Sequence, residues 1–373
     1  MSNALGIEDV DVAIIGAGSI GIAVAYYLAT RHRLTSIALI DQQPPMTLTS
    51  ARSGENYRNW WPHPTMTAFT DHSISLMEDL DRASGGRLNM TRGGYALVTR
   101  RAQPDELIEA LFRGYGDDRS RIRLHESAAG RYRPPQHHPW RDAPDGVDVL
   151  LDRALIRRTF PGYAHDIASV VHVRRAGSLS GQQLGQYMLE CLRRSGLRIH
   201  RTEVRGIEAG SPFILHLDSN HGRGQLRARR LVNAAGPLLA NVGRLLGETL
   251  PVRCVYQQKI AFEDRERVIA RELPFTIDLD PQTLDWSPDE RTLLAAEPAT
   301  RSLLETMPGG IHCRPDGPPG GTWVKLGWAY NQTPSDPQHS EPLDPHFPDM
   351  VLRGASRLHR GLAADLGRLP RGA

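Results

Sequence analysis

The sequence predicts an α/β fold of two domains, in which an antiparallel-sheet domain is inserted into a parallel-sheet domain. Near the N-terminus a buried strand, a glycine-rich turn, a helix and a second buried strand follow one another, which is the order of a βαβ unit. Farther along, PVRCVYQQKIAFED and TWVKLGWAYNQ alternate apolar and polar residues, as antiparallel strands do, and we expect a pair of strands between Leu88 and Thr99. A chain of 373 residues is long enough for two domains.

The composition is that of a globular protein and excludes several functional classes. The net charge of +3 is too small to indicate nucleic-acid binding. The three cysteines, Cys191, Cys254 and Cys313, have no metal-type spacing, so we expect free thiols, no metal site and a reducing, cytoplasmic location. The apolar stretch 10–29 follows two acidic residues and is interrupted by glycines, so no membrane span is expected.

The βαβ unit carries the spacing of a dinucleotide site. Gly16, Gly18 and Gly21 form a GxGxxG sequence between the strand DVAII and the helix SIGIAVAYYLATRH. Such glycines permit a tight turn, close approach of the backbone to a pyrophosphate and close packing of helix on strand, and the helix N-terminus attracts phosphate. Asp41 ends the second strand, 20 residues after Gly21, where a carboxylate can accept hydrogen bonds from ribose hydroxyls. We interpret this turn as a dinucleotide site rather than as a purely structural one.

Four stretches resemble the D-amino-acid oxidase superfamily of FAD-dependent oxidoreductases, which includes sarcosine oxidases, glycine oxidases and dimethylglycine dehydrogenase. They are the βαβ unit, the loop TSARSGENYRNWW (49–61), the segment that begins VDVLLDRALIRRTFPGY (147–163) and the strand RARRLVNAAG (227–236). A nicotinamide-dependent dehydrogenase would continue with βαβ units after Asp41, whereas here a long mixed segment precedes the NAAG sequence, which favours FAD. The resemblance implies a Rossmann-like FAD-binding domain at 1–87, 171–250 and 346–373, with a substrate domain at 88–170 and 251–345.

The resemblance also implies which residues bind the cofactor. They are Gly16, Gly18, Ser19, Ile20 and Gly21 at the pyrophosphate, Asp41 and Gln42 at the adenosine ribose, Ser50, Ser53 and Gly54 along the ribityl chain and flavin edge, Val204 at the adenine, and Ala234, Ala235 and Gly236 against the bound cofactor. An exposed turn is the alternative for the two serines at 50 and 53, and an ordinary strand residue is the alternative for Val204. Since Cys313 is expected to be a structural thiol, we expect FAD to be held without a covalent bond.

Arg58, in the sequence NYRNWWPHP, is the expected catalytic residue. A guanidinium can hold a carboxylate through two parallel hydrogen bonds, and Trp60 and Trp61 could wall a substrate pocket. A structural salt bridge is the alternative role for Arg58. The resemblance implies oxidation of the C–N bond of an amine or amino-acid substrate, free or N-methylated, by hydride transfer to flavin N5.

Two other functions stay open. One is an FAD-dependent 2-hydroxy-acid or glycerol-phosphate dehydrogenase on the same fold. The other is a non-catalytic flavoprotein subunit or an inactive truncated homologue, because the last residues, GLAADLGRLPRGA, resemble the entry to the part of the FAD domain that faces the flavin in relatives. We therefore expect a C-terminally incomplete FAD domain, or dependence on a partner subunit. Lys259 and Lys325 are the only lysines, so oxygen and another electron acceptor both remain possible.

Overall fold

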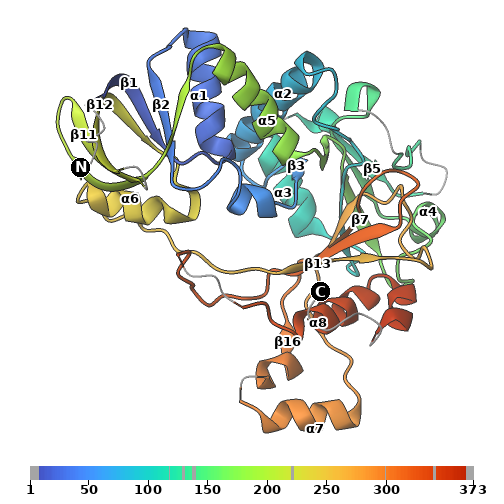
Figure 1. Cartoon of the computed structure of the whole chain (residues 1–373). Helices are drawn as coiled ribbons and strands as arrows, with labels where there is room; N and C mark the ends of the chain where they lie inside the picture. Colours follow the sequence, from blue (N-terminus) through green and yellow to red (C-terminus); the bar gives the residue numbers. More distant parts are fainter. Residues whose placement is uncertain are drawn as a thin grey trace.

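The structure, a computed structural model, describes residues 8–116, 118–127, 131–136, 140–219, 222–298, 300–338 and 342–366. Within these residues the chain forms two large β-sheets with helices packed on them, and the α/β fold expected from the sequence is confirmed. In Figure 1 the first sheet lies at the left with α1 and α5. The second sheet lies at the right, with α4 beside it and α8 below it.

The first sheet has six strands in the order β10-β11-β12-β1-β2-β9. Its strands are β1 (Glu8–Ile15), β2 (Ile37–Asp41), β9 (Arg198–Arg201), β10 (Glu203–Glu208), β11 (Phe213–Ser219) and β12 (Gly222–Asn233). β1 pairs in parallel with β2 and with β12, and β2 pairs in parallel with β9, whereas β11 pairs antiparallel with both β10 and β12. The second half of β1, residues 12–15, and residues 37–40 of β2 are continuous runs of buried apolar residues, as expected for strands covered on both faces.

Helices cover both faces of this sheet. The helices are α1 (Ser19–His32), α5 (Gly181–Arg194) and α6 (Leu239–Leu245). Because successive side chains of a strand point to opposite faces, Val12 and Ile14 pack against α1 and α5, while Ala13 and Ile15 pack on the side of Val242 in α6. The parallel strands and these helices bring the ends of β1, β2 and β12 to one edge of the sheet.

β12 extends beyond its neighbour β11. Its pairing with β11 ends at Ala228, while its pairing with β1 continues to Asn233. Among the strands that the structure describes, residues 229–233 therefore have a partner on one side only. Arg229 and Arg230 of this segment are exposed, so this strand is buried only in part.

The second sheet has eight strands in the order β13-β18-β17-β14-β4-β7-β6-β5. They are β4 (Tyr95–Thr99), β5 (Ile122–His125), β6 (Val147–Leu150), β7 (Ser169–Val173), β13 (Lys259–Glu263), β14 (Phe275–Asp278), β17 (Ile311–Pro315) and β18 (Trp323–Gly327). Five of its seven strand pairs are antiparallel, and the pairs β14–β4 and β5–β6 are parallel. The expected antiparallel character of this region is thus largely found, with strands from two distant parts of the chain.

Smaller elements complete the fold. Two-stranded sheets pair β3 (Asn56–Arg58) with β8 (Ala176–Ser178) and β15 (Gln282–Thr283) with β16 (Thr306–Met307). The remaining helices are α2 (Pro64–Ala83), α3 (Asp105–Tyr115), α4 (Arg153–Thr159), α7 (Pro288–Ala296) and α8 (Phe347–Ser356), with short 3-10 turns that include η1 (Thr49–Arg52), η4 (Gly236–Leu238) and η6 (Arg360–Asp365). No helix among the described residues is long and apolar enough to cross a membrane.

The segment from Leu88 to Thr99 holds one strand, β4, so the expected pair of strands is wrong. Instead of pairing within the segment, the backbone amides of Thr91 and Gly94 donate to the carbonyl oxygens of Ser178 and Ala176, at 2.8 and 2.9 Å. Gly94 has a φ of +89°, which turns the chain into β4. The residues before β4 therefore bond to β8 instead of forming a hairpin with β4.

α8 and η6 pack on the eight-stranded sheet. Met350, Leu352 and Leu362 share one apolar core with Leu326 and Trp328. The sequence assigned 346–373 to the FAD-binding domain, so the described part of this segment lies with the other sheet, and residues 367–373 lie outside the described residues. The remaining domain boundaries stay a prediction.

Candidate functional site

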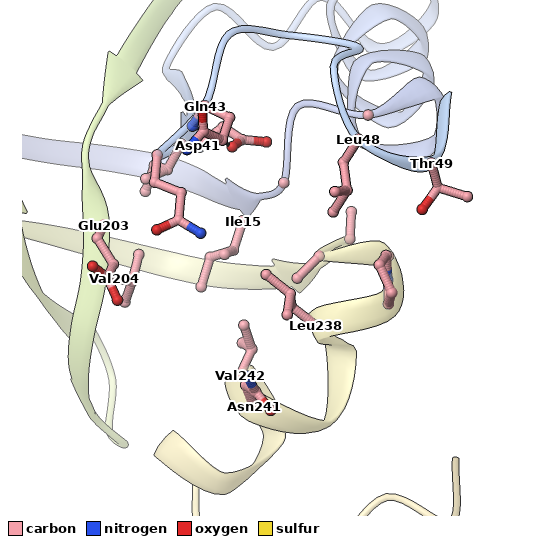
Figure 2. A pocket seen from close by; sticks show the side chains of 18 of the residues that line it. Ile15, Asp41, Gln43, Leu48, Thr49, Glu203, Val204, Leu238, Asn241 and Val242 are labelled. Atoms are coloured by element: carbon pink, nitrogen blue, oxygen red, sulfur yellow. Dashed lines mark hydrogen bonds between the residues drawn. The ribbon is translucent and has the colours of Figure 1, made fainter. Parts of the chain in front are cut away.

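A pocket of about 450 Å³ opens at the carboxyl ends of β1, β2 and β12. In open α/β sheets, ligands bind in the crevice beyond these strand ends. Figure 2 shows Asp41 and Gln43 at one end of it, Glu203 and Val204 of β10 beside them, and Leu238 and Val242 below. The predicted cofactor residues that line it are Gly16, Gly18, Asp41, Gln42, Ser50, Val204, Ala234, Ala235 and Gly236.

The glycine turn brings β1, α1 and the end of β12 into close contact. A Cβ atom on Gly16 would lie 2.2 Å from the carbonyl oxygen of Ala234. The φ of Gly16 is +107°, a conformation that is strained for any other residue. A Cβ on Gly21 would lie 1.9 Å from the carbonyl oxygen of Gly16, so Gly21 serves the packing of α1 on the turn. At Gly18 a Cβ would meet only the Ser50 hydroxyl, at 3.2 Å, so the missing side chain there leaves room facing the pocket.

Asp41 is held by two backbone amides. Its Oδ2 atom accepts a hydrogen bond from Ala17 N at 2.7 Å, and its Oδ1 atom accepts one from Gln43 N at 2.8 Å. These contacts fix the carboxylate at the end of β2 and join it to the glycine turn. A carboxylate oxygen accepts more than one hydrogen bond, so each oxygen can also accept from a ligand hydroxyl in the pocket.

The N-terminus of α1 already has an acceptor near it. Ser19 N donates to the Ser50 hydroxyl at 3.0 Å, which brings the loop after β2 onto the first turn of the helix. The five predicted cofactor residues that do not line the pocket are Ser19, Ile20, Gly21, Ser53 and Gly54. The side chain of Ile20 points outward, with 68% of its surface exposed.

Sequence reasoning missed the wall opposite the glycine turn. This wall consists of Leu238, Asn241, Val242, Arg244 and Leu245, from η4 and α6. The signal available was position, because a helix that starts directly after the NAAG sequence must begin at the same edge of the sheet. The amides of the turn, the fixed carboxylate and this largely apolar wall together fit the adenosine diphosphate part of FAD.

Arg58 lies in a second region, on β3. Its guanidinium carbon is 4.1 Å from the ring centre of Trp61 and 5.6 Å from that of Tyr95. Burial lowers the pKa of Arg58. The guanidinium has no hydrogen bond or ion pair to any residue that the structure describes, so the structural salt bridge weighed above is not found there. A half-buried guanidinium that stacks on rings and has no described hydrogen-bond acceptor leaves its five donors available to an anion.

The neighbours of Arg58 are fixed by hydrogen bonds. Tyr57 donates from its hydroxyl to Thr91 O at 2.5 Å, and the fully buried Asn59 donates from Nδ2 to Asp71 Oδ1 at 2.9 Å. Trp60 lies in the core, 3% exposed, whereas Trp61 is at the surface, and their role as walls of a substrate pocket stays a prediction. β3 therefore presents Arg58 on a rigid support.

The eight-stranded sheet contacts the loop that leaves the dinucleotide pocket. Lys259 donates from Nζ to the carbonyl oxygens of Arg52 and Ser53, at 2.8 and 2.7 Å. Arg314 donates from Nη2 to Gly54 O at 3.2 Å. The loop that carries Ser53 and Gly54, two of the predicted flavin-edge residues, thus lies against this sheet.

One face of this sheet carries a row of rings. The ring centres of Tyr95 and Phe275 are 4.5 Å apart, and those of Phe275 and His312 are 5.1 Å apart. Lys259 belongs to the same face, because the strand registers align it with Gly327 and then with His312. Cys313 points to the opposite face, into the core with α8, where burial raises the pKa of its thiol.

Among the described residues no group of histidine, cysteine and acidic side chains could hold a metal ion, and all three cysteines are free thiols. The free thiols agree with the sequence expectation. The polar groups of the two regions include backbone amides, the carboxylates of Asp41 and Glu203 and several cations, and the amides and cations suit a nucleotide and a small anion.

Comparisons with known proteins give one family and one fold. The family model of FAD dependent oxidoreductases, DAO, matches residues 11–368. Glycine oxidase from Geobacillus kaustophilus is similar in structure, with a TM-score of 0.63 and 16% identity over 96% of this chain and 80% of that one. L-proline dehydrogenase from P. horikoshii has a TM-score of 0.67 and 13% identity, over 96% of this chain and 79% of that one. L-alpha-glycerophosphate oxidase from Mycoplasma pneumoniae has a TM-score of 0.65 and 13% identity, over 96% of this chain and 81% of that one. A search of curated proteins gives no match. Identities this low show a shared fold.

Proposed function

Because the chain belongs to the DAO family of FAD-dependent oxidoreductases, we propose that it oxidises the C–N bond of an amino acid or N-methylated amino acid. In this proposal it is an enzyme of the kind of the sarcosine and glycine oxidases and dimethylglycine dehydrogenase. FAD, when bound, supplies the hydride acceptor, flavin N5. The protein's own residues bind the cofactor, bind the substrate and hold it in a reactive orientation.

The pocket at the strand ends would hold the adenosine diphosphate part of FAD without a covalent bond. The amides around Gly16 and Gly18 would face the pyrophosphate, and Asp41 would accept from the ribose hydroxyls. The remainder of the cofactor would follow the loop from Ser50 to Gly54 toward the face that carries Lys259. The buried Cys313 is separated from that face by the sheet itself.

The guanidinium of Arg58, which has no hydrogen-bond acceptor among the described residues, is the observation that carries the substrate class. Leaving a half-buried charged group without a partner costs free energy, which a carboxylate bound through two hydrogen bonds would recover. The ring row of Tyr95, Phe275 and His312 offers an apolar surface beside it. A small amino acid bound by its carboxylate would then extend its amine along this row.

The proposal also includes a cytoplasmic location, a possible partner subunit and an electron acceptor that is either oxygen or a separate carrier. Lys259 and Lys325 both lie on the sheet face near the loop, so either oxygen or a separate electron carrier is compatible with them.

Anaerobic mixing of the FAD-loaded protein with candidate substrates tests the proposal. Glycine, sarcosine and L-proline are the amines, and lactate and glycerol 3-phosphate are the matched compounds that carry a hydroxyl instead. We expect an amine with a carboxylate to bleach the flavin absorbance. Bleaching by lactate or glycerol 3-phosphate alone would favour hydroxy-acid or glycerol-phosphate oxidation instead. A protein that binds FAD and is bleached by none of them would favour a non-catalytic role.

A further inference from the structure

A groove runs along the half-paired end of β12. Among the described residues, 229–233 have a strand partner on one side only, where β1 lies. On their other side, the open side of β12, is a groove of about 760 Å³. Its walls come from α1, from the start of β11 and from β1 and β12 themselves. It shares no lining residue with the dinucleotide pocket, so it is a separate feature of the same sheet.

The open side of β12 has room for a short strand. β11 covers this side of β12 as far as Ala228, which pairs with Phe213, the first residue of β11. In a strand, backbone N–H and C=O groups point alternately to the two edges, so part of those in 229–233 point to the open side. Five extended residues span about 17 Å. A strand of this length would continue the line of β11 and satisfy these groups.

One part of the groove is apolar. Val12 and Ile14 face α1, so Arg230 and Val232, which pair with them in register, face α1 as well. The apolar side chains of the groove that are only half-buried are Val24, Leu28, Leu34, Phe213, Leu231 and Val232. Apolar side chains on an added strand would remove their exposed surface from water, which is favourable.

The other part of the groove is cationic. Arg229, Arg230 and His32 line it, and no acidic residue does. Because α1 returns along the sheet from the end of β1 to the start of β2, its last residue, His32, lies toward the same end of the groove as Arg230. Arg229 has Asp11 at 3.5 Å, whereas Arg230 has no hydrogen bond or ion pair to any residue that the structure describes. This end of the groove therefore favours negative charge.

We propose that the groove binds an extended segment of a different protein, which adds to the open side of β12 as a further strand. Its apolar side chains lie against α1, and its acidic side chains lie beside Arg229 and Arg230. A second copy of this chain is a poorer occupant, because the same edge carries the same two arginines. Charge complementarity thus selects an acidic partner.

This inference gives the partner subunit of the proposed function a place and a chemistry on this chain. It does not depend on the oxidation of an amine, because the groove and the dinucleotide pocket have no lining residue in common. Binding of a partner segment and reduction of the flavin can therefore be measured separately.

Short peptides test the groove in the FAD-loaded protein. The probes are a fluorescently labelled Asp-Glu-Val-Ile-Val peptide and its reversed sequence, because a strand can add in either direction. Fluorescence anisotropy measures their dissociation constants. We expect one of the two to bind, and its counterpart with both acids replaced by lysine to bind about tenfold more weakly. A counterpart with proline at the central position should not bind, since proline lacks the backbone N–H and distorts the strand.

Reversal of one charge in the groove sharpens the test. We expect Arg230→Glu to bind the lysine peptide more tightly than the acidic one. Arg227→Glu is the matched control, because Arg227 is also exposed on β12 but lies where that strand is paired on both sides, and it should keep the wild-type preference. Equal binding of the two peptides by the wild type, or an unchanged preference in Arg230→Glu, would overturn the proposal. A dimer that excludes the peptide would overturn it as well.

Hydrogen exchange of the wild type keeps the proposal testable if Arg230→Glu folds poorly. With saturating acidic peptide, amides within 229–233 should exchange about tenfold more slowly, while those of β9 and β10, the outermost strands of the sheet, should keep their rates. Slower exchange at β9 or β10 instead, or no change at all, would contradict the proposal. Peptide protection of 229–233 in a protein that no amine bleaches would uphold this inference while the proposed function failed.

Discussion

Lys259 Nζ lies 2.7 Å from the carbonyl oxygen of Ser53 and donates a hydrogen bond to it. The two residues are 206 positions apart in the chain, so this contact joins the eight-stranded sheet to the loop that leaves the dinucleotide pocket. A second bond to Arg52 O, at 2.8 Å, makes the ammonium a clamp on two consecutive carbonyls. The loop between the two candidate regions is thus held from the sheet that carries the ring row.

Lys259→Met should loosen this loop. Hydrogen bonds from a charged group contribute about 1.5–3 kcal/mol each when well formed, and partial exposure of this ammonium reduces that, so we expect FAD affinity to fall about tenfold. Fluorescence titration with FAD measures it, together with the rate of proteolysis at residues 49–54. Lys325→Met is the matched control, because that lysine pairs with Asp316 and has no bond to the loop. Equal losses in both variants would contradict the clamp.

Gly16→Ala and Gly18→Ala should differ sharply. At Gly16 the new methyl would meet the backbone of Ala234 and adopt a positive φ, so we expect a loss of about 3 kcal/mol in the free energy of unfolding. At Gly18 only the movable Ser50 hydroxyl lies near, so the fold should survive while the methyl keeps a phosphate from the turn. Urea unfolding and FAD titration of both variants separate the two effects. Tight FAD binding by Gly18→Ala would exclude a phosphate at this turn.

Asp41→Ala should lower FAD affinity about a hundredfold. The change removes the acceptor of the Ala17 and Gln43 amides and the expected acceptor of the ribose hydroxyls. Asp41→Asn, which keeps one acceptor oxygen, should lose less. Asp11→Asn, on the outer part of β1, is the control and should bind FAD as the wild type does. An Asp41→Ala protein with unchanged affinity would exclude the ribose contact.

Arg58→Gln should weaken the binding of any carboxylate substrate by about two to three orders of magnitude, since two charge-assisted hydrogen bonds are lost. FAD affinity should stay the same, because Arg58 is outside the dinucleotide pocket. Arg58→Lys should recover only part of the loss, because an ammonium does not form the parallel pair of bonds. Arg52→Gln is the neighbouring control, since only its carbonyl contacts Lys259. Substrate titration monitored by flavin reduction provides the constants.

Stability should fall as the pH drops below neutrality. Burial lowers the pKa of His172 from 6.5 to about 3, helped by the charge of Arg174, and burial lowers the pKa of His359 from 6.5 to about 4. Between pH 6.5 and 4 the unfolded chain binds protons that the folded chain excludes, so the free energy of unfolding rises with pH. Each histidine contributes about 1.4 kcal/mol per pH unit in this window. Urea unfolding at several pH values should give a smaller slope for His359→Gln, and an unchanged slope would contradict this account.

The N-terminal unit was predictable because its signals are local. The buried strand, the glycine spacing and Asp41 lie within one short stretch, and the NAAG sequence marks the strand that reaches the same edge. Ser50 and Val204 could be assigned to the pocket wall only through the resemblance, because nothing in their own neighbourhood distinguishes them from a turn and a strand residue.

The second region could not be derived in the same way. The bond between Lys259 and Ser53, the position of His312 over Gly327 and the packing of α8 on β17 and β18 all depend on how distant strands are ordered in one sheet. The pattern at 88–99 was misleading, since a run of alternating residues does not tell which strand it pairs with. Arg58 was identified by residue type, and only the structure reveals that its guanidinium lacks a described partner.

The half-paired end of β12 has a consequence for the purified protein. Backbone groups of residues 229–233 that find no strand beside them can join the same groups of another molecule, and concentrated solutions would then form dimers or larger assemblies. Arg229 and Arg230 oppose such self-association, because pairing of residues 229–233 from two molecules would bring four guanidinium groups together. That repulsion weakens as salt is added, so light scattering should detect self-association that grows with ionic strength.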